Sequence, residues 1–352
     1  MDANIGGESL GDLIIKSFEP VNLSNLLKSF REEDHPRDAK GRFTKKSGSI
    51  LNEKTSKLRK KITQANLLKK QTIGEEFFKL RDEARKEIDS FLESEIKKVR
   101  KNSRFKTASD AEEYVTKKYG LEAELKDFDP VTTELAITAF DNVAKKVPKL
   151  MNEIKENIKH VGCPRTFNEK FKAQMGKKWS LDIEEKMVSF AKATNPNVKS
   201  EFIIRSHVRD FLKNGSEEMN KYAYASTNPV NITFGDIWKN IKKVKDTFSE
   251  SILLENHAKD NFSIASIIEH EFGHHIVFNI QMGDDGRKKM SLRKFFDSVP
   301  YEDRVKISEY GTSNDDEFFA ETFVEFLSDP ENKREDYTVG KFRHLLKDLG
   351  YI

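Results

Sequence analysis

Residues 267–278 read IIEHEFGHHIVF and contain the pattern His-Glu-x-x-His, which starts at His270. Positions four apart lie one turn apart on one face of an α-helix, so His270 and His274 can direct two imidazole nitrogens at one metal ion. Glu271 lies about 100° around such a helix, beside the metal position, where it can accept a proton. The apolar neighbours predict a buried helix over 263–280. Because buried imidazoles without a partner are costly, we expect a bound metal.

Zinc suits these donors best, because two imidazoles, one carboxylate and one open position for water form its usual catalytic pattern. We expect one Zn²⁺ per chain. The extended metzincin pattern would need Gly at 277 and His at 280, but the chain has Val277 and Ile280. The third ligand should therefore come from a later helix. His275 is predicted to be a packed or solvent-edge histidine, with substrate contact as the alternative.

A second buried helix is predicted over 314–327, with Asn314 as its N-cap. Glu317 and Glu321 lie four residues apart on one face of it. A buried pair of carboxylates needs cations or hydrogen-bond donors. We assign Glu317 to the metal, and Glu321 to the remaining N–H of a ligating histidine. The opposite roles for the two glutamates remain an alternative.

Three motifs of the chain resemble the catalytic domain of anthrax lethal factor and its relatives, which are gluzincin-type zinc endopeptidases. These motifs are His270-Glu271-Phe272-Gly273-His274, Tyr310-Gly311 and Glu317-Phe318-Phe319-Ala320-Glu321. The resemblance is strong over about 265–328. It implies that His270, His274 and Glu317 bind zinc. It further implies that Glu271 is the general base and that Tyr310, seven residues before the third ligand, assists the transition state.

We therefore predict a zinc metalloendopeptidase that hydrolyses peptide bonds with a metal-activated water, Glu271 as general base and Tyr310 as oxyanion donor. Residues 219–237 predict a hairpin or two short strands. An extended substrate would add to an edge strand of this sheet. The residues proposed for that edge strand are Asn231, Ile232, Thr233 and Phe234. An internal core strand is the alternative for them.

The predicted fold class is α+β, mostly helical with a small sheet. Residues 1–50 are predicted to be a flexible tail, and residues 51–128 a charged helical region with one apolar stripe, as in a helical hairpin or coiled-coil arm. Residues 129–352 are predicted to form a zincin-like metallopeptidase domain, whose first helix starts near Pro130.

Charge is distributed unevenly along the chain, although the net charge is only +3. Residues 40–70 carry eleven Lys/Arg and one acid, whereas residues 301–337 carry twelve Asp/Glu and four Lys/Arg. The basic segment lacks interleaved aromatic residues, which weighs against nucleic-acid binding. No apolar stretch is long enough for a transmembrane helix, no signal peptide is recognisable, and the single Cys163 excludes an intrachain disulfide.

The block His35-Pro36-Arg37-Asp38, followed by Gly41-Arg42-Phe43, is typical of tails and linkers in phage virion and head-morphogenesis proteins. We therefore expect a phage or prophage origin, with location in the host cytoplasm or the virion. Expected partners are a peptide or protein substrate and, through the N-terminal region, phage structural proteins. The alternatives are a virion structural or tethering protein with a zincin domain, and a toxin-like effector that cleaves a host protein. Glu271 favours the enzyme, because a scaffold needs zinc ligands but no general base.

Overall fold

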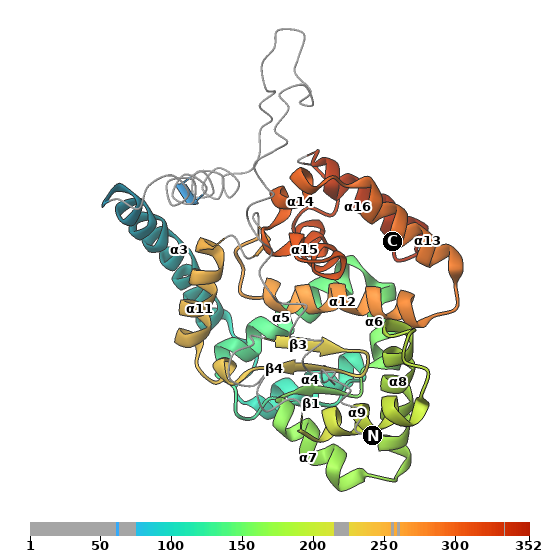
Figure 1. Ribbon diagram of the computed structural model, residues 1–352. Helices are drawn as coiled ribbons and strands as arrows, with labels where there is room; N and C mark the ends of the chain where they lie inside the picture. The colour runs from blue at the N-terminus through green and yellow to red at the C-terminus, as the bar shows by residue number, and fades with distance from the viewer. Residues whose placement is uncertain (1–60, 63–74, 215–224, 255–256, 259–260, 334) are drawn as a thin grey trace, which may run out of the picture.

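The computed structural model describes residues 61–62, 75–214, 225–254, 257–258, 261–333 and 335–352. Over these residues the chain forms a mostly helical α+β fold with one small mixed sheet (Figure 1), which confirms the predicted fold class. The predicted tail at 1–50, nearly all of the basic segment at 40–70 and the proposed partner-binding region lie outside the described residues. In the described part of the chain, no helix has both the length and the apolar character needed to cross a membrane.

The described residues contain one sheet of four strands, in the order β1-β2-β4-β3. β1 (Ala123–Glu124), β2 (His160–Gly162) and β4 (Asn231–Phe234) are parallel, and β3 (Ala225–Asn228) is antiparallel to β4. Asn228 closes the β3–β4 hairpin, because its Oδ1 accepts hydrogen bonds from the backbone N–H groups of Val230 and Asn231. The predicted hairpin is therefore confirmed in its described part.

The prediction that Asn231, Ile232, Thr233 and Phe234 form an edge strand is wrong. Strand β4 lies inside the sheet, paired with β2 on one side and with β3 on the other. All four residues are buried, and Ile232 and Phe234 belong to the main apolar core. Side chains that are buried on both faces are typical of an inner strand whose two faces are covered. The alternative, an internal core strand, is what the structure shows, and the outer position belongs to β3.

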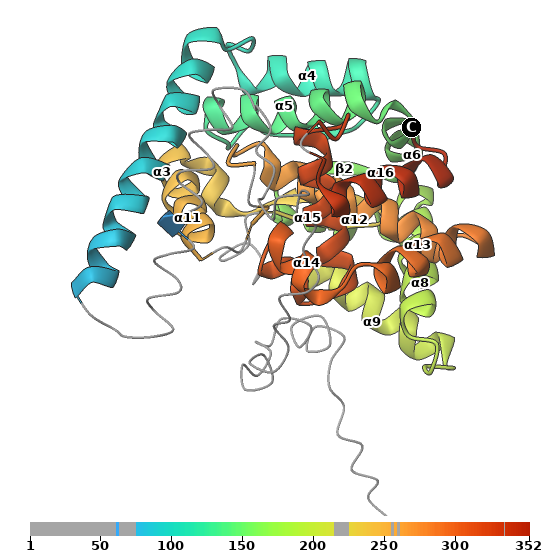
Figure 2. The same ribbon diagram turned by 90° about the horizontal axis from the view of Figure 1, so that it is seen from above.

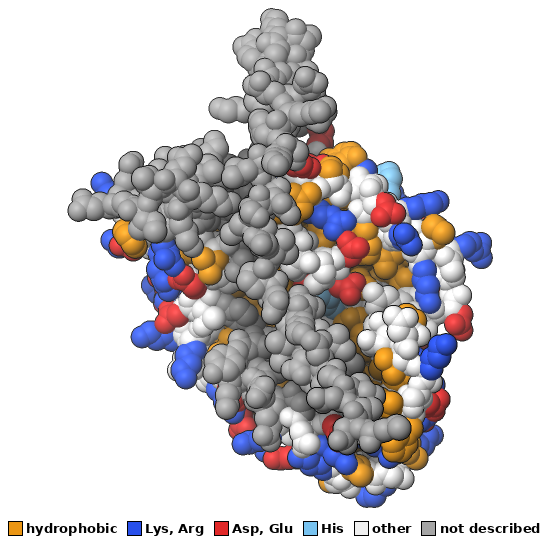
Figure 3. Space-filling model, in the orientation of Figure 1, with side chains coloured by type: hydrophobic (Ala, Val, Ile, Leu, Met, Phe, Trp, Pro, Cys, Tyr) orange, Lys and Arg blue, Asp and Glu red, His pale blue; other side chains and the backbone are white. Residues whose placement is uncertain are grey.

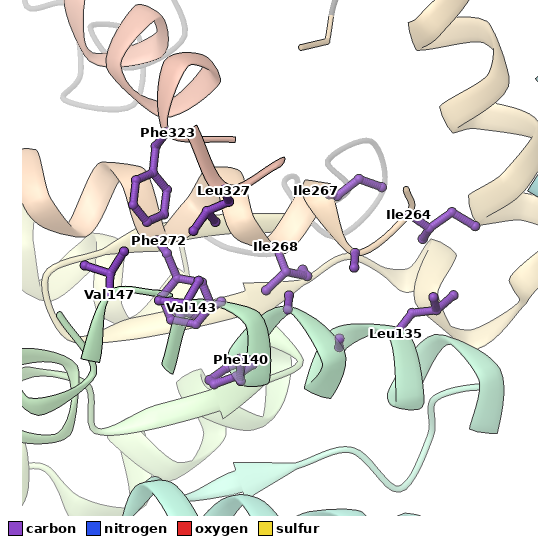
Figure 4. Close-up of a cluster of buried hydrophobic side chains, with 14 of the residues drawn as sticks. Leu135, Phe140, Val143, Val147, Ile264, Ile267, Ile268, Phe272, Phe323 and Leu327 are labelled. Carbon is purple, nitrogen blue, oxygen red and sulfur yellow. The ribbon is translucent and has the colours of Figure 1, made fainter. Parts of the chain in front are cut away.

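Helix α12 (Ser266–Met282) contains the His-Glu-x-x-His pattern and runs through the centre of the molecule. It packs against α5 (Pro130–Lys146), strand β3 and α15 (Asp315–Ser328), and it is buried along most of its length. Phe272 of α12 meets Phe140 of α5 edge-on, with ring centroids 4.8 Å apart. Figure 4 shows apolar side chains of these three helices meeting in one core. The predicted buried helix is therefore confirmed.

Helix α15 starts at the predicted N-cap, because Oδ1 of Asn314 accepts a hydrogen bond from the backbone N–H of Glu317 at 2.9 Å. Figures 1 and 2 show α15 lying across α12. The two helices touch at Gly273, where an added Cβ atom would lie 2.7 Å from Cα of Ala320. Only glycine at position 273 therefore lets the two backbones come this close.

Helix α3 (Glu75–Asn102) lies in the segment predicted to be helical with one apolar stripe. It packs against α11 (Ile241–Leu253) and α5, and Arg81 and Arg85 form ion pairs with Glu250 of α11. The buried residues of the stripe are Ala84, Ile88, Leu92 and Ile96. The described part of the stripe is thus buried by other helices of the same chain. One apolar core extends across residue 129, which is the predicted domain boundary.

The remaining elements surround this centre. Their bounds are α4 (Ala108–Tyr119), α6 (Pro148–Asn157), α7 (Pro164–Gln174), α8 (Lys178–Thr194), α9 (Glu201–Asn214), η3 (Asp236–Lys239), α13 (Gly286–Ser298), α14 (Tyr301–Ile307), η4 (Tyr310–Thr312) and α16 (Tyr337–Asp348). Helices α7, α8 and α9 enclose a second, smaller apolar core. Helices α13, α14 and α16 cover α15 on the side away from the sheet (Figure 1).

The contact between α12 and α15 predicts that Gly273→Ala destabilises the protein. The new methyl group would overlap Ala320, and overpacking typically costs about 1–3 kcal/mol. This cost opposes the gain of about 1 kcal/mol that alanine usually brings to a helix interior. The measurement is urea unfolding of the metal-free protein. Gly286→Ala is the matched control, because nothing lies within 4 Å of its added Cβ. Equal stability of both variants would contradict the prediction.

Candidate metal centre

Three side-chain atoms from two helices meet in one place, namely Nε2 of His270, Nε2 of His274 and Oε2 of Glu317. Nε2 of His270 lies 3.1 Å from Nε2 of His274 and 3.0 Å from Oε2 of Glu317, and the third side of the triangle measures 3.4 Å. A tetrahedral cation with bonds of about 2.0–2.1 Å, as zinc has, holds neighbouring donors about 3.3 Å apart. The triangle therefore has the size that one such cation requires.

Two buried side chains set how α12 is rotated in the fold. Glu269 accepts hydrogen bonds from Nδ2 of Asn142 on α5 at 2.8 Å and from Nδ2 of Asn261 at 3.2 Å. On the other side of the helix, Nε2 of His275 makes a short hydrogen bond with the hydroxyl of Thr227 on β3. With both of these faces held, the face that carries the two motif histidines is turned toward α15.

His275 is thus a packed residue, as predicted. Only 1% of its surface is exposed, and burial lowers its pKa to about 3, so the ring is neutral. A ring with its Nε2 engaged by Thr227 and no open surface is not available for the alternative role, contact with a substrate.

The charges around the triangle favour a cation. The carboxylates of Glu271, Glu317 and Glu321 are all buried beside the two imidazoles. Burial alone would lower the pKa of His270, but the carboxylates of Glu317 and Glu321 raise it well above its ordinary value. Burial alone would raise the pKa of Glu317, but His274 and His270 hold it well below its usual range. The protein therefore stabilises positive charge at this position, which a divalent ion would supply.

Glu321 lies behind His270, outside the triangle. Its Oε1 is 2.7 Å from Nδ1 of His270, although the N–H is not well aligned with that oxygen. The structure thus brings Glu321 to the nitrogen of His270 that faces away from the triangle. A carboxylate in this place orients an imidazole and makes it a better ligand. The alternative in which Glu321 is the ligand and Glu317 stands behind does not match these positions.

His257 is a neighbour of this centre that the sequence did not reveal. Its Nδ1 lies 3.7 Å from Oε1 of Glu321, and its Nε2 lies 2.7 Å from Oγ of Ser266 at the start of α12. Burial lowers the pKa of His257. The residue precedes α12 in a segment without periodicity, so no spacing rule connects it with the motif.

Glu271 is buried on α12 next to the triangle, but it contributes no atom to it. Burial raises the pKa of its carboxyl group. Tyr310, in η4, also lies close to the triangle, with its ring centroid 6.2 Å from that of His270. Burial and the carboxylate of Glu317 raise the pKa of Tyr310, so its hydroxyl keeps its proton. The structure thus brings both predicted catalytic residues to the triangle.

The turn that carries Tyr310 is held by polar contacts. Oγ of Ser308 accepts a hydrogen bond from the backbone N–H of Gly311 at 2.7 Å. Arg304 of α14 pairs with Asp315 at 2.6 Å, and its guanidinium lies 4.7 Å from the centre of the Phe318 ring. The first contact closes the turn, and the other two join α14, which precedes the turn, to the first residues of α15, which follow it. Tyr310 and Glu317 therefore keep a defined relative position.

The predicted substrate residues at 231–234 are not part of this centre. Strand β3 is the strand that contacts α12, and it occupies the outer position of the sheet next to β4. In Figure 3, histidine surface is visible at the level of α12, bordered by acidic and hydrophobic side chains.

Comparisons with known proteins found no match to this chain, whether with family models, with curated proteins or with solved structures.

The triangle predicts which substitutions remove the metal. His274→Ala and Glu317→Gln should each lose stoichiometric zinc, because two donors hold a divalent ion much less firmly than three. Glu271→Gln should keep it, because Glu271 contributes no donor atom to the triangle. Mass-spectrometric metal analysis after dialysis against zinc measures the outcome. Loss of zinc from Glu271→Gln, or its retention in the other two variants, would contradict the assignment.

Proposed function

We propose that this chain is a zinc-dependent endopeptidase. The observation that carries the proposal is the donor triangle of two imidazoles and one carboxylate, with Glu271 as a further carboxylate beside it. Two histidines and a glutamate, which leave one coordination position open, are the ligand set of catalytic zinc in peptidases. A purely structural site has no use for Glu271, which favours the enzyme over a scaffold.

The chain's own residues supply the proton transfers. Bound zinc would lower the pKa of a water molecule to about 7 and polarise the substrate carbonyl. Glu271 would accept a proton from the attacking water and pass it to the leaving amine. Its burial next to the triangle keeps the carboxyl group away from bulk water, so the proton stays within the site.

Tyr310 is the proposed donor to the oxyanion that develops on the substrate. Its hydroxyl is protonated, and its ring lies near that of His270. A hydrogen bond that forms only as the charge develops lowers the barrier without tightening substrate binding. The resemblance to the lethal factor family assigns the same role to this residue.

Strand β3 replaces β4 as the proposed docking edge for the substrate. β3 pairs with β4 on one side, and no described strand pairs with its other side. The hydroxyl of Thr227 anchors β3 to α12 through His275. An extended peptide that adds to β3 would therefore run alongside α12 and pass the donor triangle. The zincin-like domain that the sequence predicts over 129–352 belongs to the same proposal, and in the structure its core and its sheet continue into α3 and β1.

The proposal predicts hydrolysis of peptides by the zinc-loaded protein. Wild-type protein incubated with a random peptide library should yield cleavage products that mass spectrometry identifies. Glu271→Gln should lose at least about 10²-fold in rate, because proton transfer to a placed carboxylate contributes that much. The same variant should still contain zinc. A library left intact by zinc-loaded wild-type protein would overturn the proposal.

The role of Tyr310 predicts a separate kinetic signature. Tyr310→Phe removes the hydroxyl and leaves the ring, so kcat should fall by about 10²–10³ while KM changes little. Steady-state kinetics on one peptide found in the library would show this. A rise in KM with kcat unchanged would instead mean that Tyr310 stabilises the bound substrate and the transition state equally.

A further inference from the structure

The face of α12 that carries the metal triangle continues beyond His274. Phe278 and Gln281 follow His274 by four and seven residues, so the three side chains share one face of the helix. α12 is buried as far as Val277, whereas Phe278 and Gln281 are only half-buried. This face of α12 therefore reaches the surface of the molecule one turn after His274.

Two aromatic rings lie at this part of the surface. The ring of Phe278 stacks nearly parallel to that of His274, with centroids 6.0 Å apart and an interplanar angle of 15°. Phe190 of α8 meets Phe278 edge-on at 4.9 Å and is also half-buried. An alkyl chain that entered beside His274 would pack against these rings.

Asp316 of α15 lies next to this face of α12. Asp316, in the first turn of α15, accepts a hydrogen bond from Nε2 of Gln281 at 3.3 Å. The carbonyl oxygen of Gln281 is fully buried, so only its Nε2 group takes part in this contact. No lysine or arginine of the described chain forms an ion pair with Asp316, and its charged neighbours are His274, Glu317 and Asp315.

Asp316 differs from the two neighbouring acidic residues in its partners. Asp315 pairs with Arg304, and Glu317 belongs to the triangle. Asp316 could act only as a favourable charge at the start of α15. That role would not explain its hydrogen bond with Gln281, which ties it to the face of α12 that carries His274. A half-buried carboxylate that pairs with no cation of the described chain calls for a cationic partner.

We propose that Phe190, Phe278, Gln281 and Asp316 form a subsite for a lysine or arginine side chain of the substrate. The aliphatic part lies against the two rings, and the cationic end donates to the carboxylate of Asp316, which the Nε2 group of Gln281 holds in place. Because the subsite adjoins His274, the basic residue lies within two positions of the bond that is cut. This inference rests on the proposed endopeptidase function and names its substrate class.

The test begins with the cleavage sites that the peptide library reveals for zinc-loaded wild-type protein. Lysine and arginine should be enriched at one position within two residues of the cut. Two fluorogenic peptides are then compared, identical except for lysine or norleucine at that position. Norleucine keeps the alkyl chain and lacks the ammonium group. We expect kcat/KM to be at least about tenfold higher for the lysine peptide, as for a desolvated charge pair.

Asp316→Asn should bring the ratio of the two kcat/KM values close to one, since asparagine keeps the shape and removes the charge. Asp284→Asn is the matched control, because Asp284 is exposed and lies outside the subsite; its ratio should equal that of the wild type. Gln281→Met is the second variant, and it should lower the ratio without altering α15. Thermal unfolding and zinc content show whether each variant is folded and loaded.

Binding separates this inference from the proposed function. Fluorescence polarisation with the Glu271→Gln protein measures the affinity for the lysine and norleucine peptides without cleavage. A preference for lysine that Asp316→Asn removes would support the subsite even if no peptide is hydrolysed, in which case only the endopeptidase proposal fails. Cleavage without lysine or arginine enrichment, or a ratio that Asp316→Asn leaves unchanged, would overturn the subsite.

Discussion

The close approach of α12 and α15 is the constraint on which the rest of the centre depends. At Gly273 the two backbones are so near that an added Cβ would lie 2.7 Å from Cα of Ala320. Gly273 precedes His274, and Ala320 lies one turn after Glu317, so this contact sets the spacing of the donors on both helices. A wider separation would move the carboxylate of Glu317 out of reach of a cation held by the two imidazoles.

Charge and packing act together in this arrangement. Burying three carboxylates beside two imidazoles is unfavourable unless positive charge joins them. The apolar contacts of α12, such as Phe272 with Phe140, supply the stability that permits this. Glu269 and His275 hold the helix on its two other faces. The centre is therefore a polar group of residues that a largely apolar surrounding keeps in place.

Helical spacing and capping rules were sufficient to predict the site residues that lie within one helix. The i and i+4 spacing of His270 and His274, and the N-cap Asn314, depend only on neighbouring residues, and the structure has both as predicted. The pairing of α12 with α15 also followed from the sequence, because both helices are apolar and carry costly polar groups that need each other. The edge strand was mispredicted, because the pattern of a short apolar strand does not say which neighbours it has.

The sequence by itself determined the types of residue at the centre and their spacing along each helix. Only the tertiary structure decided that β3 is the outer strand next to α12, that His257 stands beside Glu321, and that Asp316 faces Gln281. The physical reason is the range of the interactions. Helical spacing and capping act over three or four residues, whereas these contacts join segments whose separation is fixed by the packing of the whole core.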